Sequence, residues 1–118
     1  MFLLLTAGPD DPSSALPFVA AKGALEDGDD VAIVAMADAV RLLTDETDLH
    51  ALDASGLPTV GHVVERLREA DALTDAVALR DCCSARGIRE ADLADWASMD
   101  AESAVSRVAA GHETTLTF

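Results

Sequence analysis

The fold is decided by residues 2–36, which have the sequence FLLLTAGPDDPSSALPFVAAKGALEDGDDVAIVAM. Two apolar runs of strand length, residues 2–6 and 31–36, enclose a segment at residues 15–26 whose apolar positions fall near helical spacing. Two strands that are joined through a helix run parallel in one sheet, and their crossover is right-handed. These residues therefore predict a βαβ unit.

The rest of the chain continues this alternation of strands and helices. The segment from residue 59 onward carries valine and leucine on one face and charged side chains on the other, which is typical of a half-buried helix. Residues 44–58 are polar, are broken by glycine and proline, and are predicted to form a loop. Further strands are expected at residues 76–79, 94–99 and 112–118, and further helical segments at residues 38–43, 84–86, 89–93 and 100–111. The sequence thus predicts an α/β protein with a mostly parallel five-stranded sheet.

The length of 118 residues is the usual size of one domain. We expect a single domain over residues 1–118, with no linker. Half of the residues are hydrophobic but only 3% are aromatic, so the core is expected to consist of small side chains. Each buried residue then contributes little free energy, and assembly into oligomers would add stability.

The charge balance excludes several classes of partner. The chain has 22 acidic residues against 8 basic ones, and its formal net charge is −14. Such a surface repels phosphate backbones and anionic lipid headgroups, so neither nucleic acid nor a membrane is expected as a partner. Lys22 is the only lysine. This composition resembles that of proteins adapted to high salt, where screening relieves self-repulsion, and we hypothesise a halophilic source.

Other features bear on the cellular compartment. Met1 to Leu5 are apolar, but no basic segment precedes them and the Gly8–Asp11 turn follows closely, so a strand is expected rather than a signal peptide. No stretch reaches the length of a transmembrane helix. The two cysteines, Cys82 and Cys83, are adjacent and cannot connect distant parts of the fold. These features favour the reducing cytoplasm.

The cysteines are the residues whose position favours chemistry. Cys82 and Cys83 come shortly after the predicted strand at residues 76–79. In parallel α/β sheets, ligands gather beyond the carboxyl ends of the strands, and the Gly8–Asp11 loop should lie at the same edge. A thiolate is favoured there by a helix N-terminus and by cations such as Arg86. Free cysteines are as often small buried core residues, so both interpretations stay open.

Four stretches of the sequence resemble the DsrE/DsrF-like family. They are Thr6 to Pro12, Met36 to Leu43, Cys82 to Ile88 and Thr114 to Phe118, and together they span nearly the whole chain. The resemblance implies a flavodoxin-like three-layer fold with helices on both faces of the sheet. It also implies assembly into trimers or hexamers, and a cysteine that accepts persulfide sulfur and passes it on.

Within this resemblance, Cys82 matches the family cysteine that precedes an Arg-Gly pair, here Arg86 and Gly87. Leu79 stands where many relatives carry a second cysteine, so the paired motif is incomplete. Cys83 could replace it as a resolving thiol only through a strained ring. The candidate site residues are Cys82, Cys83 and Arg86 as the reactive group, and Gly8, Pro9, Asp10 and Asp11 as a facing pocket wall.

No metal ion and no cofactor are expected. His50, His62 and His112 are scattered along the chain, with no Cys or His at ligand spacing. The glycine motifs that bind dinucleotides or nucleotide phosphates are absent from the sequence. Trp96 has no basic residues around it and is expected to pack in the core or in a subunit interface.

Two functions follow from these observations. The first is a small cytoplasmic sulfur-relay protein in which Cys82 accepts a sulfane sulfur as a persulfide and passes it to a partner protein, with Arg86 stabilising the anionic sulfur. Whether this would be sulfurtransferase turnover or carriage alone stays open. The alternative is a non-catalytic oligomeric scaffold of the same fold with unreactive cysteines. The expected partners are sulfur donor and acceptor proteins and further copies of the chain.

Overall fold

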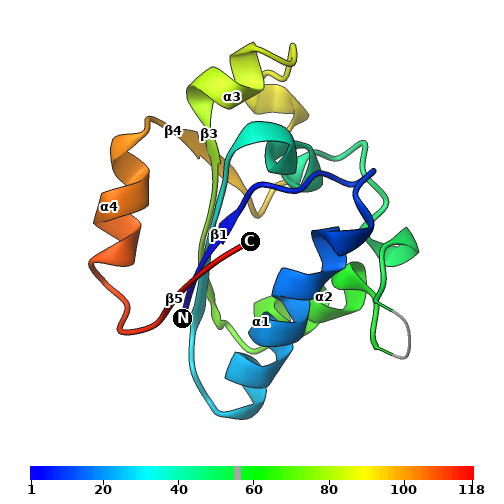
Figure 1. The fold of residues 1–118 in the computed structure, drawn as a ribbon, viewed down its shortest axis with the longest axis vertical. Helices are drawn as coiled ribbons and strands as arrows, with labels where there is room; N and C mark the ends of the chain where they lie inside the picture. The colour runs from blue at the N-terminus through cyan, green and yellow to red at the C-terminus, as the bar shows by residue number, and fades with distance from the viewer. Residues whose placement is uncertain (55–56) are drawn as a thin grey trace.

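The computed structural model describes residues 1–54 and 57–118 (Figure 1). Within these residues, five parallel strands form one sheet in the order β4-β3-β2-β1-β5. The strands are β1 (Phe2–Leu5), β2 (Val31–Ala35), β3 (Leu73–Leu79), β4 (Ser98–Asp100) and β5 (Thr115–Thr117). The α-helices are α1 (Leu16–Glu26), α2 (Val60–Glu69), α3 (Arg80–Ser84) and α4 (Ser103–Ala109). Short 3-10 helices are η1 (Pro12–Ala15), η2 (Ala37–Leu43), η3 (Leu49–Ala51) and η4 (Glu90–Asp92).

The strand order explains which helices cover which face. From β1 to β4 the chain crosses the sheet in one direction, so right-handed crossovers place α1 and α2 on the same face. The step from β4 to β5 runs in the opposite direction, and α4 covers the other face (Figure 1). The predicted three-layer, flavodoxin-like fold with helices on both faces is confirmed, and the sheet is parallel throughout.

Side chains alternate between the two faces of the sheet, as the pleat requires. Phe2 and Val34 pack with Val108 of α4. Their neighbours Leu3 and Ile33 face the opposite way, into the larger core formed with α1 and α2. Strand β2 is buried at every residue, because it lies in the middle of the sheet with helices on both sides. Because β1, β2 and β3 are adjacent and parallel, their carboxyl ends meet at one edge of the sheet.

Three strands differ in length by three or more residues from the sequence prediction. Strand β5 covers only Thr115–Thr117 of the predicted residues 112–118, because the N–H of His112 still bonds the carbonyl oxygen of Ala109 in the turn that ends α4 (3.1 Å). Strand β3 begins at Leu73, three residues earlier than expected, since exposed Thr74 and Asp75 interrupt the apolar pattern without ending the strand. Strand β4 is confined to Ser98–Asp100, because residues 94–97 form a turn that is closed by a backbone hydrogen bond from Ala97 to Ala94 (3.0 Å).

The last helix also begins later than expected. Asp100 ends β4 instead of capping α4, and its carboxylate accepts a hydrogen bond from the N–H of Ala101 (2.7 Å) and pairs with Arg107 (2.6 Å). The predicted loop at residues 44–58 contains η3, and its residues 55–56 lie outside the described residues. No helix in the described part of the chain is long and apolar enough to cross a bilayer.

We expect moderate acid to strengthen the fold slightly and stronger acid to weaken it. Lowering the pH from 7 towards 5 reduces the net charge of −14 and with it the repulsion between carboxylates. Further acid removes stabilising contacts, because hydrogen bonds hold the pKa values of several carboxyl groups below their usual values. These groups are Asp11, Glu26, Asp29, Asp92 and Asp100.

The lowered pKa values of these carboxyl groups determine how the stability of the fold changes in acid. A carboxyl group with a lowered folded-state pKa stabilises the fold above its unfolded pKa, near 3.8 for Asp and 4.5 for Glu, and this is lost as the pH falls through the folded value. The urea midpoint should therefore rise from pH 7 to about pH 5 and fall below about pH 4. A midpoint that falls steadily from pH 7 would contradict this expectation.

Candidate functional site

Helix α3 places both cysteines at the carboxyl edge of the sheet. It begins at Arg80, directly after the last residue of β3, so Cys82 and Cys83 lie in its first turn. The sequence prediction placed the helical turn at residues 84–86, too late by one turn. The predicted end of that turn holds, because Gly87 adopts a left-handed conformation with φ of 68°.

The two cysteines occupy different surroundings. Cys83 is fully buried in the core on the α1 and α2 side of the sheet. Burial raises the pKa of its thiol, the neighbouring Cys82 raises it further, and Arg86 offsets part of the increase. Cys82 is only half-buried, and its Sγ accepts a hydrogen bond from the backbone N–H of Ala37 (3.2 Å). Cys82 is thus the cysteine that a second molecule can reach.

The Ala37 donor lies in a turn just beyond strand β2. Met36 is still extended, whereas Ala37 has a φ of 51°, in the left-handed region that residues with a Cβ rarely adopt. Ala37 is the first residue of η2, and this turn brings residue 37 next to α3. A contact between residues 45 positions apart is therefore made by the backbone, independently of the side chain at position 37.

A chain of ion pairs links three loops at this edge. Arg86 Nε donates to Asp38 Oδ1 (3.2 Å), and Arg41 Nη1 donates to Asp38 Oδ2 (3.2 Å) and to Asp10 Oδ2 (2.8 Å). Asp10 and then Asp38 raise the pKa of Arg41. Arg86 Nη1 also donates to the carbonyl oxygen of Cys82 (3.1 Å). The guanidinium of Arg86 is therefore bonded to a carboxylate and to the backbone next to the thiol.

The predicted pocket wall takes part in this arrangement at two points. Buried Gly8 lies beneath Asp38, and a Cβ at position 8 would lie 2.1 Å from Asp38 Oδ2 and 2.8 Å from its backbone oxygen. Asp10 reaches Arg41, as described above. Asp11 instead caps η1 by accepting from Ser13, which lowers the pKa of its carboxyl. Among the described residues, the Gly8–Asp11 loop is thus linked to Cys82 through Asp38 and Arg41.

Two shallow hollows adjoin the chain of ion pairs. One, of about 190 Å³, is lined by Pro9, Asp10 and Asp11 and by residues 51–53. The other, of about 240 Å³, lies beside Arg41 and Arg86. Thr44, Glu46, Thr47 and Ile88 complete its lining. The hollows therefore adjoin the Asp10 end and the arginine side chains of the ion-pair chain, and neither is lined by Cys82 or Asp38.

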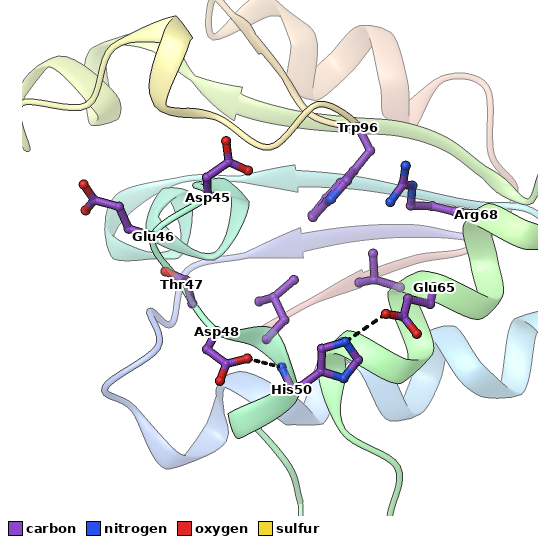
Figure 2. Close-up of a pocket in the computed structure, with 11 residues that line it drawn as sticks. Asp45, Glu46, Thr47, Asp48, His50, Glu65, Arg68 and Trp96 are labelled. Atoms are coloured by element: carbon purple, nitrogen blue, oxygen red, sulfur yellow. Dashed lines mark hydrogen bonds and ion pairs between the residues drawn. The ribbon is translucent and has the colours of Figure 1, made fainter.

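A larger hollow of about 420 Å³ lies between the start of the 44–58 segment, helix α2 and Trp96 (Figure 2). His50 Nε2 is 2.9 Å from Glu65 Oε1, and the N–H of His50 donates to Asp48 (3.1 Å). The imidazole fits against Gly61, where a Cβ would approach it to 2.7 Å. Trp96 is half-buried and packs against the core, as expected. None of the predicted site residues lines this hollow.

The described residues contain no group of three or more His, Cys, Asp or Glu side chains that could hold a metal ion. Sequence reasoning missed Ala37, Asp38 and Arg41, which the structure places beside Cys82 and Arg86. The sequence does contain a signal for them, because these residues follow the second predicted strand. Ligand sites of parallel sheets lie beyond the carboxyl ends of the strands, and this holds for the loop after β2 as it does for the loops after β1 and β3.

The fold and the Cys82 site at the carboxyl edge of the sheet define a class of protein. It is a parallel three-layer α/β protein with a half-buried thiol just beyond the central strands. The family model for the DsrE/DsrF-like family matches residues 1–118, and the chain belongs to this family. No functionally curated protein matches the chain.

Solved structures agree with this assignment at the level of the fold. The YchN protein from E. coli superposes with a TM-score of 0.74 and 17% sequence identity, over 99% of this chain and 97% of that one. The protein MTH1491 of unknown function from Methanobacterium thermoautotrophicum superposes with a TM-score of 0.67 and 14% identity, over 99% and 98%. At these identities the likeness concerns the fold alone.

Proposed function

We propose that this chain is a sulfur-relay protein in which Cys82 carries one sulfane sulfur as a persulfide between a donor protein and an acceptor protein. The observation that supports it most directly is the half-buried Cys82 Sγ with a backbone donor at 3.2 Å, at the carboxyl edge of the sheet. Membership of the DsrE/DsrF-like family supports a role of the sulfur-relay type in general.

The transfer is a thiol exchange. The Cys82 thiolate attacks the outer sulfur of a donor persulfide, R–S–SH, and a new S–S bond forms on Cys82. The S–S bond of the donor breaks, and its electron pair leaves with the donor thiolate, R–S⁻. The acceptor repeats the same step in the forward direction. No external oxidant or reductant is required, since the sulfur moves at constant oxidation state.

The other candidate residues have supporting roles in this proposal. Arg86 lies beside the thiol and can add positive charge for the persulfide anion, although its hydrogen bonds go to Asp38 and to the carbonyl oxygen of Cys82. The Gly8–Asp11 loop forms the far side of the edge. Burial and a raised thiol pKa make Cys83 a poor nucleophile at neutral pH, so we propose it as a packing residue.

We expect the native chain to gain one sulfur atom when it is incubated with a protein persulfide donor and examined by intact-mass spectrometry without reductant. The gain should be reversed by dithiothreitol. Cys82→Ser should abolish it, and the matched variant Cys83→Ala should retain it, since only Cys82 is accessible. A gain that persists in Cys82→Ser, or no gain from any sulfane donor, would rule the relay out.

A scaffold role is the second candidate, because Leu16 and Val19 lie one turn apart on α1 and are 48% and 38% exposed. This role needs a stable oligomer with unreactive cysteines. Light scattering tests the oligomer, and the sulfur-loading experiment above distinguishes the scaffold from the relay, because a scaffold should gain no sulfur. Assembly into trimers or hexamers, a reducing cytoplasm and a salt-adapted cell are further parts of the proposal.

A further inference from the structure

In the Cys82 site, taken as the sulfur carrier proposed above, a backbone N–H and not the expected cation bonds the sulfur. The only hydrogen bond to Cys82 Sγ within the described residues comes from the N–H of Ala37. Arg86, the cation expected to stabilise the sulfur, uses its guanidinium elsewhere. A thiolate or persulfide anion accepts a hydrogen bond more strongly than a neutral thiol does, so a fixed N–H favours the charged form.

We propose that the backbone N–H of Ala37 is the donor that stabilises the sulfur anion on Cys82, and that Asp38 is the positioning residue that holds this donor in place. The inference rests on the proposed relay for its biological meaning. Its physical content is the reactivity of the Cys82 thiol, which can be measured without any sulfur donor.

The direction of the Ala37 N–H depends on an unfavourable backbone conformation. The peptide between Met36 and Ala37 is oriented by the extended ψ of Met36 and by the left-handed φ of 51° at Ala37. Such a conformation persists in a residue with a Cβ only when the surrounding contacts require it. Without these contacts, Ala37 would relax to an ordinary conformation and its N–H would turn away from the sulfur.

Asp38 supplies the contacts that hold the turn. One carboxylate oxygen bonds Arg86, which lies two residues after the end of the helix that carries Cys82, and the other bonds Arg41 on η2. Arg41 in turn bonds Asp10 after β1. Buried Gly8 permits this arrangement, because any side chain there would occupy the place of the Asp38 carboxylate. Asp38 therefore fastens the Ala37 turn to helix α3.

The sign of the effect separates positioning from simple charge. Asp38 is negative and lies near the thiol, so removing its charge should speed the reaction of Cys82 if only Coulomb interactions matter. Its removal also frees Arg86 to approach the sulfur, which acts in the same direction. If Asp38 works by positioning the Ala37 donor, its removal should instead slow the reaction at neutral pH.

The test uses the full-length chain with Cys83→Ala, so that Cys82 is the only thiol. Iodoacetamide alkylation is followed at pH 7 and pH 10, with and without Asp38→Asn. Because ordinary thiols are ionised at pH 10, the rate at that pH reports access to the sulfur. We expect Asp38→Asn to slow alkylation about tenfold at pH 7, the loss of about one charge-assisted hydrogen bond, and by less than about twofold at pH 10. Asp75→Asn, on the exposed start of β3, should leave both rates unchanged.

An equal or faster rate at pH 7 in Asp38→Asn overturns the proposal, and so does an equal slowing at both pH values. Circular dichroism at each pH confirms that the variant is folded, and Asp38→Ser provides a second variant with the same expected sign. Sulfur loading is measured separately on the same proteins. Failure to load with an intact alkylation pattern would remove the relay and leave the Ala37 donor standing, whereas the reverse pattern would remove only the donor.

Discussion

Replacing Gly8 by alanine should lower the free energy of unfolding by about 1–3 kcal/mol, the usual range for an overpacked buried site. The added Cβ would lie 2.1 Å from Asp38 Oδ2 and 2.8 Å from the backbone oxygen of Asp38. The carboxylate could swing aside only by leaving Arg41 or Arg86, and the backbone oxygen belongs to a turn that is already strained at Ala37. Both relaxations lose contacts, so the energy cannot be recovered locally.

Gly23 provides the matched control for this substitution. It lies on the exposed side of α1, and a Cβ there would meet nothing within 4 Å. Gly23→Ala should therefore raise the free energy of unfolding by about 0.5–1 kcal/mol, through better helix propensity. Urea unfolding of the two variants should give midpoints that shift in opposite directions at an unchanged slope. If both variants shift alike, the close approach of Asp38 to Gly8 is not a constraint on the fold.

The layers of the fold could be predicted because they depend on local patterns. Residues 2–36 contain two apolar runs and a helical segment, and strand alternation with a parallel crossover needs no further information. The faces of the sheet then follow from crossover handedness, which assigns α4 to the side opposite α1 and α2. The extents of β3, β4 and β5 were predicted wrongly. The three residues of β4, for example, carry too short a pattern to be distinguished from the turn before them.

The candidate site could be predicted only in part. The position of Cys82 after β3 follows from the strand pattern, whereas the helix that carries it starts at Arg80, one turn earlier than the sequence predicts. Which groups touch it is decided by pairs far apart in the chain, such as Ala37 with Cys82 and Asp38 with Arg86. The left-handed conformation of Ala37 has no sequence signal, because glycine is the residue that normally marks such a turn. The sequence likewise does not tell which of the two cysteines is buried, because the burial of Cys83 depends on how the core packs.

We expect molar salt to raise the free energy of unfolding by about 3–5 kcal/mol over its value in dilute buffer. A net charge of −14 is held within a radius of gyration of 12.9 Å. In dilute buffer of about 0.01 M ionic strength the Debye length is about 30 Å, comparable to the size of the molecule, so most of these charges repel one another. At 2 M salt the Debye length falls to about 2 Å. Unfolding separates the charges, so the repulsion is a cost of the folded state that salt relieves. Salt also weakens the nine surface ion pairs among the described residues. Exposed pairs of this kind often contribute nothing measurable to stability, so we expect the relief of repulsion to outweigh their loss.

Urea unfolding across a sodium chloride series measures this effect, and sucrose at matched osmolality controls for solvent exclusion without screening. Four exposed carboxylates that make no ion pair in the described structure offer a sharper control: Asp27, Asp75, Glu102 and Glu113. Replacing all four by lysine changes the charge by two units at each position and should reduce the salt sensitivity to less than half, because repulsion grows with the square of the net charge. A wild-type fold equally stable in dilute buffer and in molar salt would mean that the acidic surface is balanced locally, and that its composition is no adaptation to a salt-rich interior.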